Sequence, residues 1–235
     1  MRMQTSILLV EDDVNLSTVL ADYLRSKGYT VEQAGHGAEA WDLMLVKHYD
    51  LVISDIMMPK MNGYELLKLV RQKYERLPII ILSAKTDRDD IIHAYELGCD
   101  DYVTKPFSPS ELMARIDAVY RRVSLTVESD IEKNSDNIIA IGEFVLDLRS
   151  HTLTKNGENI DLTQMEFQII EYFFTNPNVA LDRSDILKFV WGDSYFGDEK
   201  VVDVNIHRLR NKVEEEPSQP KHLTTVWGMG YKWIV

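Results

Sequence analysis

Charged side chains follow several short apolar runs in the first half of the chain. Glu11, Asp12 and Asp13 stand directly after the first of these runs, Asp55 follows another, and Lys105 follows a third. Carboxylates gathered in one small volume repel each other and raise each other's pKa unless a cation neutralises them. A hard divalent ion with oxygen ligands meets that need, and Mg²⁺ also suits phosphoryl chemistry. These residue types therefore indicate a metal-assisted phosphoryl site.

The same residues suggest how a phosphoryl group would be transferred. Asp55 would attack phosphorus in line, and Lys105 would give a fixed positive charge to the product oxygens. Each residue alone has a simpler explanation. An acid after a strand often caps the next helix, which we expect of Asp13, while Lys105 or Ser83 alone is commonly a solvated lysine or a strand-end serine. Their joint occurrence after several strands favours the functional interpretation.

The elements that would position these residues alternate in type. Apolar runs without polar alternation predict buried strands, at residues 7–10, 30–33, 51–54, 79–83 and 101–104. Amphipathic stretches at 14–26, 65–74 and 87–97 and a capped start at 108–111 predict helices between and after them. This alternation predicts an α/β fold, a (βα)5 doubly wound parallel sheet. In the flavodoxin-like order 2-1-3-4-5, the first and third strands would bring Glu11, Asp12 and Asp55 together.

A change of amino-acid composition divides the chain. We predict a first domain at 1–122, a polar linker at 123–137 and a second domain at 138–235. In the second domain, strands are expected at 144–148 and 151–155, helices at 163–174, 182–191 and 199–213, and a closing hairpin at 224–227 and 231–235. These elements predict an α+β unit of the winged-helix kind.

The composition limits the possible partners. The net charge is −12, and residues 138–235 hold 10 basic and 15 acidic side chains. DNA binding would therefore require the basic groups to gather on one face. No apolar run approaches the roughly 20 residues that span a bilayer, and the first residues lack a signal-peptide pattern, so we expect a cytoplasmic protein. The single cysteine, Cys99, excludes an internal disulfide.

Four motifs occur in order along the first domain: Val10-Glu11-Asp12-Asp13, residues 50–59 from Asp50 to Pro59, Leu82-Ser83-Ala84 and residues 101–107. With this ordered set, residues 7–122 resemble the receiver domain of response regulators. The resemblance implies that Asp55 accepts a phosphoryl group from a histidine of a sensor kinase. It implies Mg²⁺ (or Mn²⁺) ligands at Glu11, Asp12, Asp55 and the Met57 carbonyl. It also implies that Ser83 and Lys105 contact the phosphoryl group and that Tyr102 reorients when Ser83 moves. The Lys105–Pro106 bond would be cis.

The receiver resemblance also implies a homodimer formed on phosphorylation. Phosphorylation adds about −1.5 to −2 charge, and the face around the fourth and fifth helices and the fifth strand would shift. The matching interface positions are Ile92, Tyr95, Asp100, Asp101, Glu111, Ala114, Arg115 and Arg122. Ile91 stands where the family usually has a basic partner for Glu111, so dimerisation here is expected to depend more on apolar contact.

The second domain contains two motifs, at residues 203–210 and 224–232. With these motifs it resembles the winged-helix effector of the OmpR/PhoB class. The resemblance implies that the helix at 200–213 enters the major groove and that the hairpin touches the minor groove or backbone. The implied DNA contacts are Lys200, Asn205, His207, Arg208, Arg210, Thr225 and Trp227. Trp227 departs from the arginine of some members, and the loop at 191–199 is a possible RNA polymerase contact.

The sequence leaves three functions to consider: a transcription regulator, a phosphatase and a protein-interaction module. We favour a transcription regulator controlled by phosphorylation over an enzyme. A phosphatase with Asp55 as nucleophile usually has a second acid two residues later, where this chain has Met57. A protein-interaction module without phosphate or DNA binding is the third possibility.

Overall fold

The computed structural model describes residues 5–124, 137–192, 195 and 198–235, with the side chains of 121–124 left out. The chain divides into two compact units, Met1–Val119 and Tyr120–Val235. Most of the predicted linker lies outside the described residues, so the domain limits given above stay predictions. Within the described part of the chain, no helix combines the length and apolar character needed to cross a membrane.

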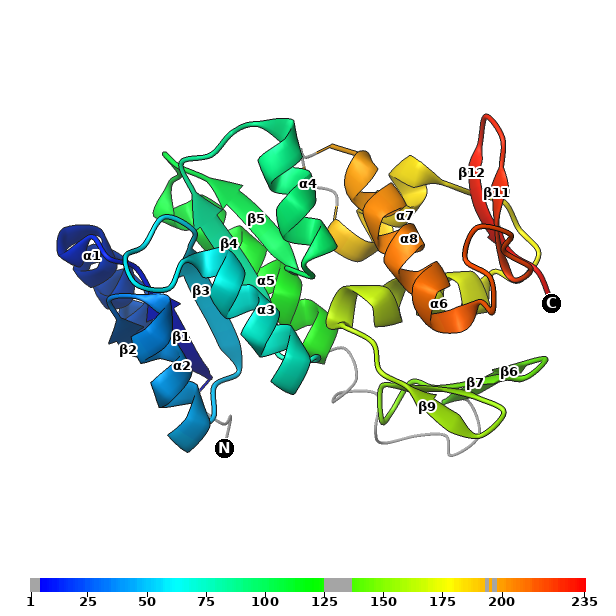
Figure 1. Ribbon diagram of the computed structural model, residues 1–235, viewed down its shortest axis with the longest axis horizontal. Helices are drawn as coiled ribbons and strands as arrows, with labels where there is room; N and C mark the ends of the chain where they lie inside the picture. Colours follow the sequence, from blue (N-terminus) through cyan, green and yellow to red (C-terminus); the bar gives the residue numbers. More distant parts are fainter. Residues whose placement is uncertain (1–4, 125–136, 193–194, 196–197) are drawn as a thin grey trace. The chain divides into compact units, whose positions relative to one another are not determined.

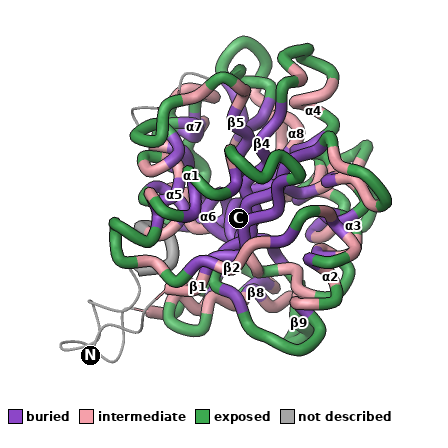
Figure 2. The backbone as a smooth tube through the Cα atoms, turned by 90° about the vertical axis from the view of Figure 1, so that its left-hand side faces the viewer, coloured by how far each residue is buried: buried purple, intermediate pink, exposed green. Residues whose placement is uncertain are grey.

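A five-stranded parallel sheet forms the centre of the first unit, in the order β2-β1-β3-β4-β5 (Figure 1). Its strands are β1 (Ser6–Val10), β2 (Thr30–Ala34), β3 (Leu51–Asp55), β4 (Ile79–Ser83) and β5 (Asp101–Thr104). All residues of β3 and β4 are buried, as expected where helices cover both faces of a parallel sheet; β4 is drawn in the buried colour in Figure 2. The predicted α/β fold and strand order are confirmed.

Five helices connect and follow these strands. They are α1 (Val14–Ser26), α2 (Gly37–Val46), α3 (Gly63–Lys73), α4 (Arg88–Glu96) and α5 (Pro109–Ser124). The Asp13 side chain accepts hydrogen bonds from the backbone N–H groups of Asn15 and Leu16, which confirms that Asp13 caps α1. Asn62 and Glu65 form a reciprocal capping box at the start of α3. These caps fix where α1 and α3 begin, and therefore where the preceding loops must turn.

In its described residues, the second unit has two antiparallel sheets and, after the end of α5, three helices. One sheet has the order β6-β7-β8-β9 and the other β10-β12-β11. The strands are β6 (Ile138–Ile141), β7 (Phe144–Asp147), β8 (Thr152–Lys155), β9 (Glu158–Ile160), β10 (Leu181–Asp182), β11 (Leu223–Val226) and β12 (Gly230–Trp233), and the helices are α6 (Gln164–Thr175), α7 (Arg183–Trp191) and α8 (Lys200–Val213). The three helices and the closing hairpin confirm the winged-helix expectation, whereas β6, β9 and β10 were not predicted.

Candidate functional site

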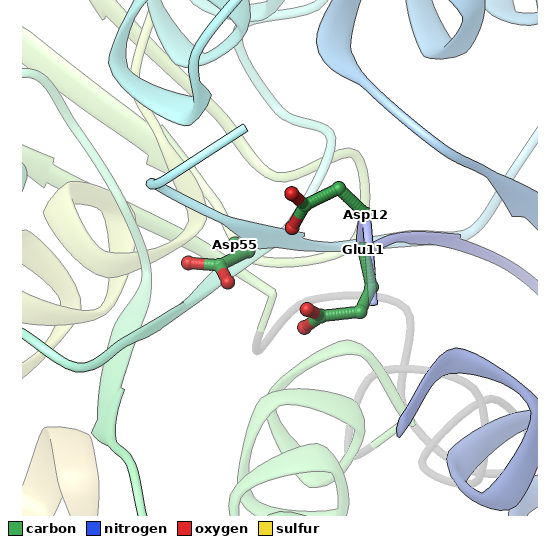
Figure 3. Close-up of side chains that lie close together, drawn as sticks. All are labelled: Glu11, Asp12 and Asp55. Carbon is green, nitrogen blue, oxygen red and sulfur yellow. The ribbon is translucent and has the colours of Figure 1, made fainter. Parts of the chain in front are cut away.

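Three carboxylates meet at the carboxyl ends of β1 and β3. Glu11, Asp12 and Asp55 each offer an oxygen, and these oxygens lie within 4.8 Å of one another; Figure 3 shows the three side chains beside each other. Glu11 and Asp55 are buried, at 3% and 5% exposed, while Asp12 is exposed. The site therefore has a buried floor and one acid open to solvent.

The loop after β3 folds back tightly against Asp55. Gly63 N–H donates to the Ile56 carbonyl at 3.0 Å. A side chain at Gly63 would collide with the carbonyl oxygen of Asp55 and the Cα of Ile56. Glycine is thus required at the start of α3 by the close approach of two backbone segments.

Gly63→Ala is expected to destabilise the first unit by about 1–3 kcal/mol, because the added methyl must push the backbone that carries Asp55. Chemical denaturation monitored by circular dichroism would measure the loss. Gly35→Ala is the matched control, since its methyl would meet only Glu39 Oε2 at an ordinary 3.6 Å. Equal stability of the two variants would show that the close approach at Gly63 is not rigid.

Lys105 brings a positive charge to these acids. Its Nζ donates to Glu11 Oε2 at 2.7 Å and to Asp55 Oδ2 at 2.5 Å. Lys105 N–H donates to the Ser83 carbonyl at 2.7 Å, which ties the lysine to the end of β4. The Lys105–Pro106 bond is cis, as the resemblance implied. Burial alone would lower the pKa of Lys105, but hydrogen bonds to the two carboxylates raise it overall, so the ammonium stays charged.

The two buried acids differ in their surroundings. Burial raises the pKa of Glu11 above its ordinary value, although the hydrogen bond from Lys105 works against that rise. Asp55 Oδ1 accepts from the Met57 backbone N–H at 3.1 Å, while its other oxygen faces Lys105. Both Asp55 oxygens are therefore oriented by the protein before any ligand arrives.

Ser83 and Tyr102 are linked through the backbone of Lys85. Ser83 is fully buried, and its Oγ accepts from Lys85 N–H at 3.0 Å. The Tyr102 hydroxyl donates to the Lys85 carbonyl at 2.9 Å. Burial raises the pKa of Tyr102, which keeps this hydroxyl a donor. Ser83 and Tyr102 thus both bond the backbone of Lys85, and a hydrogen bond from Ser83 counteracts part of the rise in the pKa of Tyr102.

In the second unit, α8 is fixed to α6 by a buried acid. Glu166 is fully buried and accepts from Arg208 Nε at 2.9 Å and from Lys212 Nζ at 2.8 Å. It also closes the capping box with Thr163 at the start of α6. Burial would raise the pKa of Glu166, but the charges of Arg208 and Lys212 lower it overall. Glu166 therefore sets how α8 lies against its own domain.

The hairpin of β11 and β12 is tied to α8 by polar contacts. Arg210 Nε donates to the Leu223 carbonyl at 2.8 Å, and its Nη2 donates to Thr225 Oγ1 at 2.9 Å. The Tyr231 hydroxyl donates to Asp203 Oδ1 at 2.7 Å. These bonds hold the hairpin in a fixed place beside the helix.

Known proteins share both halves of this arrangement. The model of the response regulator receiver domain matches residues 7–117, and that of the transcriptional regulatory protein C terminus matches 157–233. The chain is 40% identical, over 97% of its length and 98% of the relative's, to the sensory transduction protein RegX3 of Mycolicibacterium smegmatis. It is 38% identical, over 96% and 98%, to the uncharacterized transcriptional regulatory protein YcbL of Bacillus subtilis. A solved cysteine-to-serine mutant of RitR is 26% identical with a TM-score of 0.77, covering 97% of this chain and 98% of that one.

The chain belongs to the OmpR/PhoB-type two-component response regulators. It is thus a response regulator with a receiver domain and a DNA-binding domain, and it acts in transcription regulation. This family is one of regulators rather than of typical enzymes, so the phosphatase interpretation gains no support.

The positions predicted for the dimer interface of this response regulator differ in exposure. Tyr95, Asp100 and Asp101 are each 1% exposed. Asp100 binds Arg71 at 2.6 Å, and Asp101 lies 3.4 Å from Arg115. Of the other predicted positions, Glu111 and Ala114 are exposed and Ile92 and Arg115 are half-buried, while the Arg122 side chain lies outside the described residues.

The predicted DNA contacts of the response regulator differ in exposure. Asn205 is 3% exposed, and its Nδ2 donates to the Val201 carbonyl one turn earlier at 2.8 Å. The remaining predicted contacts reach the surface to different extents: Lys200, His207 and Trp227 are exposed, and Arg208, Arg210 and Thr225 are half-buried. Nothing in the sequence indicated that two basic residues of α8 would converge on Glu166.

Proposed function

We propose that Asp55 accepts a phosphoryl group from a histidine of a sensor kinase, and that this controls promoter binding by the second unit. The observation that carries the proposal is the convergence of Glu11, Asp12 and Asp55 with the Lys105 ammonium in one volume. The matched family supports the same conclusion.

The donor set at this site fits Mg²⁺ or Mn²⁺. Three carboxylate oxygens within 4.8 Å match the hard oxygen ligands that these ions take. The residues that would hold the ion are Glu11, Asp12 and Asp55, with the Met57 backbone carbonyl. A bound ion would neutralise charge on the carboxylates and on an incoming phosphoryl group.

The residues of the chain supply the rest of the chemistry. An oxygen of Asp55 forms a bond to phosphorus as the phosphorus–nitrogen bond of the donor phosphohistidine breaks. The imidazole nitrogen leaves with the electron pair. Lys105, already hydrogen-bonded to Asp55, supplies a fixed positive charge for the phosphoryl oxygens. The product is an acyl phosphate on a buried side chain.

The output would pass through Ser83 and Tyr102. A phosphoryl group on Asp55 would draw the Ser83 hydroxyl from its bond with Lys85 N–H, and Tyr102 would respond through the same residue. We propose that this favours a homodimer through the face that holds Ile92, Glu111 and Ala114. Promoter DNA, and RNA polymerase at the loop before α8, complete the proposed partners.

Mg²⁺ is expected to raise the thermal stability of the wild-type protein, because an ion that binds only the folded state stabilises it by about 2.7 kcal/mol at 100 times its Kd. Asp12→Asn should lose most of this gain, since it removes the exposed ligand without disturbing the buried pair. Differential scanning calorimetry with and without Mg²⁺ measures the effect. Asp22→Asn, an exposed acid of α1, is the control and should respond like the wild type.

Phosphoryl transfer to the protein is tested by intact mass after incubation with acetyl phosphate. The wild-type protein should gain one phosphoryl group when Mg²⁺ is present and none when the ion is chelated. Labelling that does not depend on the ion would contradict the assigned metal site.

A further inference from the structure

The charged side chains of α8 are largely engaged by their own domain. Arg208 and Lys212 are bound to Glu166, and Arg210 is bound to the Leu223 carbonyl and to Thr225. Asp203, the one acid of this helix, lies 2.7 Å from Arg183 Nε. These contacts bind three basic side chains and one acidic side chain of α8 to other residues of the same domain.

A different set of α8 residues faces solvent. The exposed residues are Lys200, His207 and Asn211, whereas the opposite face packs in the core through Val201, Val202, Asn205, Ile206, Leu209 and Val213. His207 and Asn211 are four residues apart, which places them on one face of the helix. Their side chains are neighbours, with Asn211 Nδ2 and His207 Nε2 3.5 Å apart. The solvent face of α8 thus carries two adjacent polar groups of short reach.

We infer that His207 and Asn211 read base edges in the major groove, and that Asn211 selects adenine. The inference rests on the proposed function, since it assumes that α8 enters the groove. Asparagine can bond adenine N6 and N7 together, and a histidine ring nitrogen can pair with a single base-edge donor or acceptor. Asn211 was not among the residues predicted from sequence.

The neutrality of the Asn211 amide gives the inference a distinct signature. The salt dependence of DNA binding reports how many phosphates are neutralised, not how bases are read. Loss of the Asn211 side chain should therefore change the preferred sequence and leave the salt slope unaltered.

The test is selection from a random double-stranded DNA pool by the full-length protein treated with acetyl phosphate and Mg²⁺. The wild type should enrich a motif that contains an adenine, and Asn211→Ala should lose preference at that base pair alone. Affinity of Asn211→Ala for the wild-type motif should fall about five- to 150-fold. His207→Ala should relax a neighbouring position, and Asn159→Ala, an exposed asparagine of β9, should select the wild-type motif.

Each outcome of the selection decides a separate point. If Asn211→Ala and His207→Ala enrich the wild-type motif with unchanged affinity, the assignment of the reading pair is overturned. If their motif is unchanged but the salt slope falls, the two residues contact the backbone, which also overturns it. If the wild type enriches no sequence, the proposed function itself fails. Circular dichroism of the variants should match that of the wild type, because both side chains are on the surface.

Discussion

Asp55→Asn is expected to abolish phosphoryl labelling of the protein by acetyl phosphate. The amide cannot act as the anionic nucleophile, while its size and shape are those of the carboxylate. The loss should be complete within detection, because the other acids of the site would serve as metal ligands rather than acceptors. Intact mass spectrometry of the protein after incubation with acetyl phosphate and Mg²⁺ measures the label.

The control for this experiment is Asp22→Asn, which removes an exposed acid of α1 and should be labelled like the wild type. The variant Asp55→Asn should remain folded, since Lys105 keeps its bond to Glu11. Labelling of Asp55→Asn at the wild-type stoichiometry would refute the assignment of the acceptor. Labelling that moves to Asp12 would show that the site is right but the nucleophile is not.

Glu166→Ala is expected to destabilise the second unit by about 3–5 kcal/mol, the cost of breaking a buried charge pair by removing one partner. The substitution leaves Arg208 and Lys212 without their shared carboxylate and removes half of the capping box with Thr163. Urea unfolding followed by tryptophan fluorescence suits this test, because Trp191 and Trp233 are buried in this unit. Glu158→Ala, an exposed acid of β9, should cost little.

The pH dependence of unfolding provides a second test of how the Glu166 charge contributes to stability. Its pKa is lowered in the folded state from an ordinary 4.5. A lowered carboxyl pKa adds stability that is fully present above the unfolded value and is lost as pH falls toward the folded value. The wild-type second unit should therefore lose stability below about pH 4.5 more steeply than Glu166→Gln. If the free energy of unfolding depends on pH identically in the two proteins, the charge of Glu166 does not stabilise the second unit.

The receiver half was predictable because its signals are local. Runs such as the one at 79–83 are apolar throughout, which only a strand buried on both faces explains. Asp13 stands one residue before a helical period, so its role as a cap followed from position. The strand order then placed Glu11 and Asp55 together. The resemblance implied a phosphoryl contact for Lys105 but not its hydrogen bonds to Glu11 and Asp55, which depend on a loop whose path the sequence pattern does not show.

Three residues that the resemblance implied at contact surfaces, Asn205, Asp100 and Asp101, are buried in the structure. Each is buried because a nearby partner satisfies it: the Val201 carbonyl for Asn205, Arg71 for Asp100, and the Tyr102 backbone N–H for Asp101. Such partners come from tertiary packing or from the preceding helical turn, and residue type does not reveal them. The strands β9 and β10 were missed because three and two residues carry no readable alternation.

The most direct test of phosphorylation-controlled DNA binding is the affinity of the full-length protein for a selected promoter fragment, measured by fluorescence anisotropy at fixed salt. With acetyl phosphate and Mg²⁺ present, wild-type affinity should rise, and Asp55→Asn should stay at the untreated level. Equal affinity of the treated and untreated wild type, with the acyl phosphate verified by mass, would contradict the conclusion that Asp55 controls the DNA-binding domain.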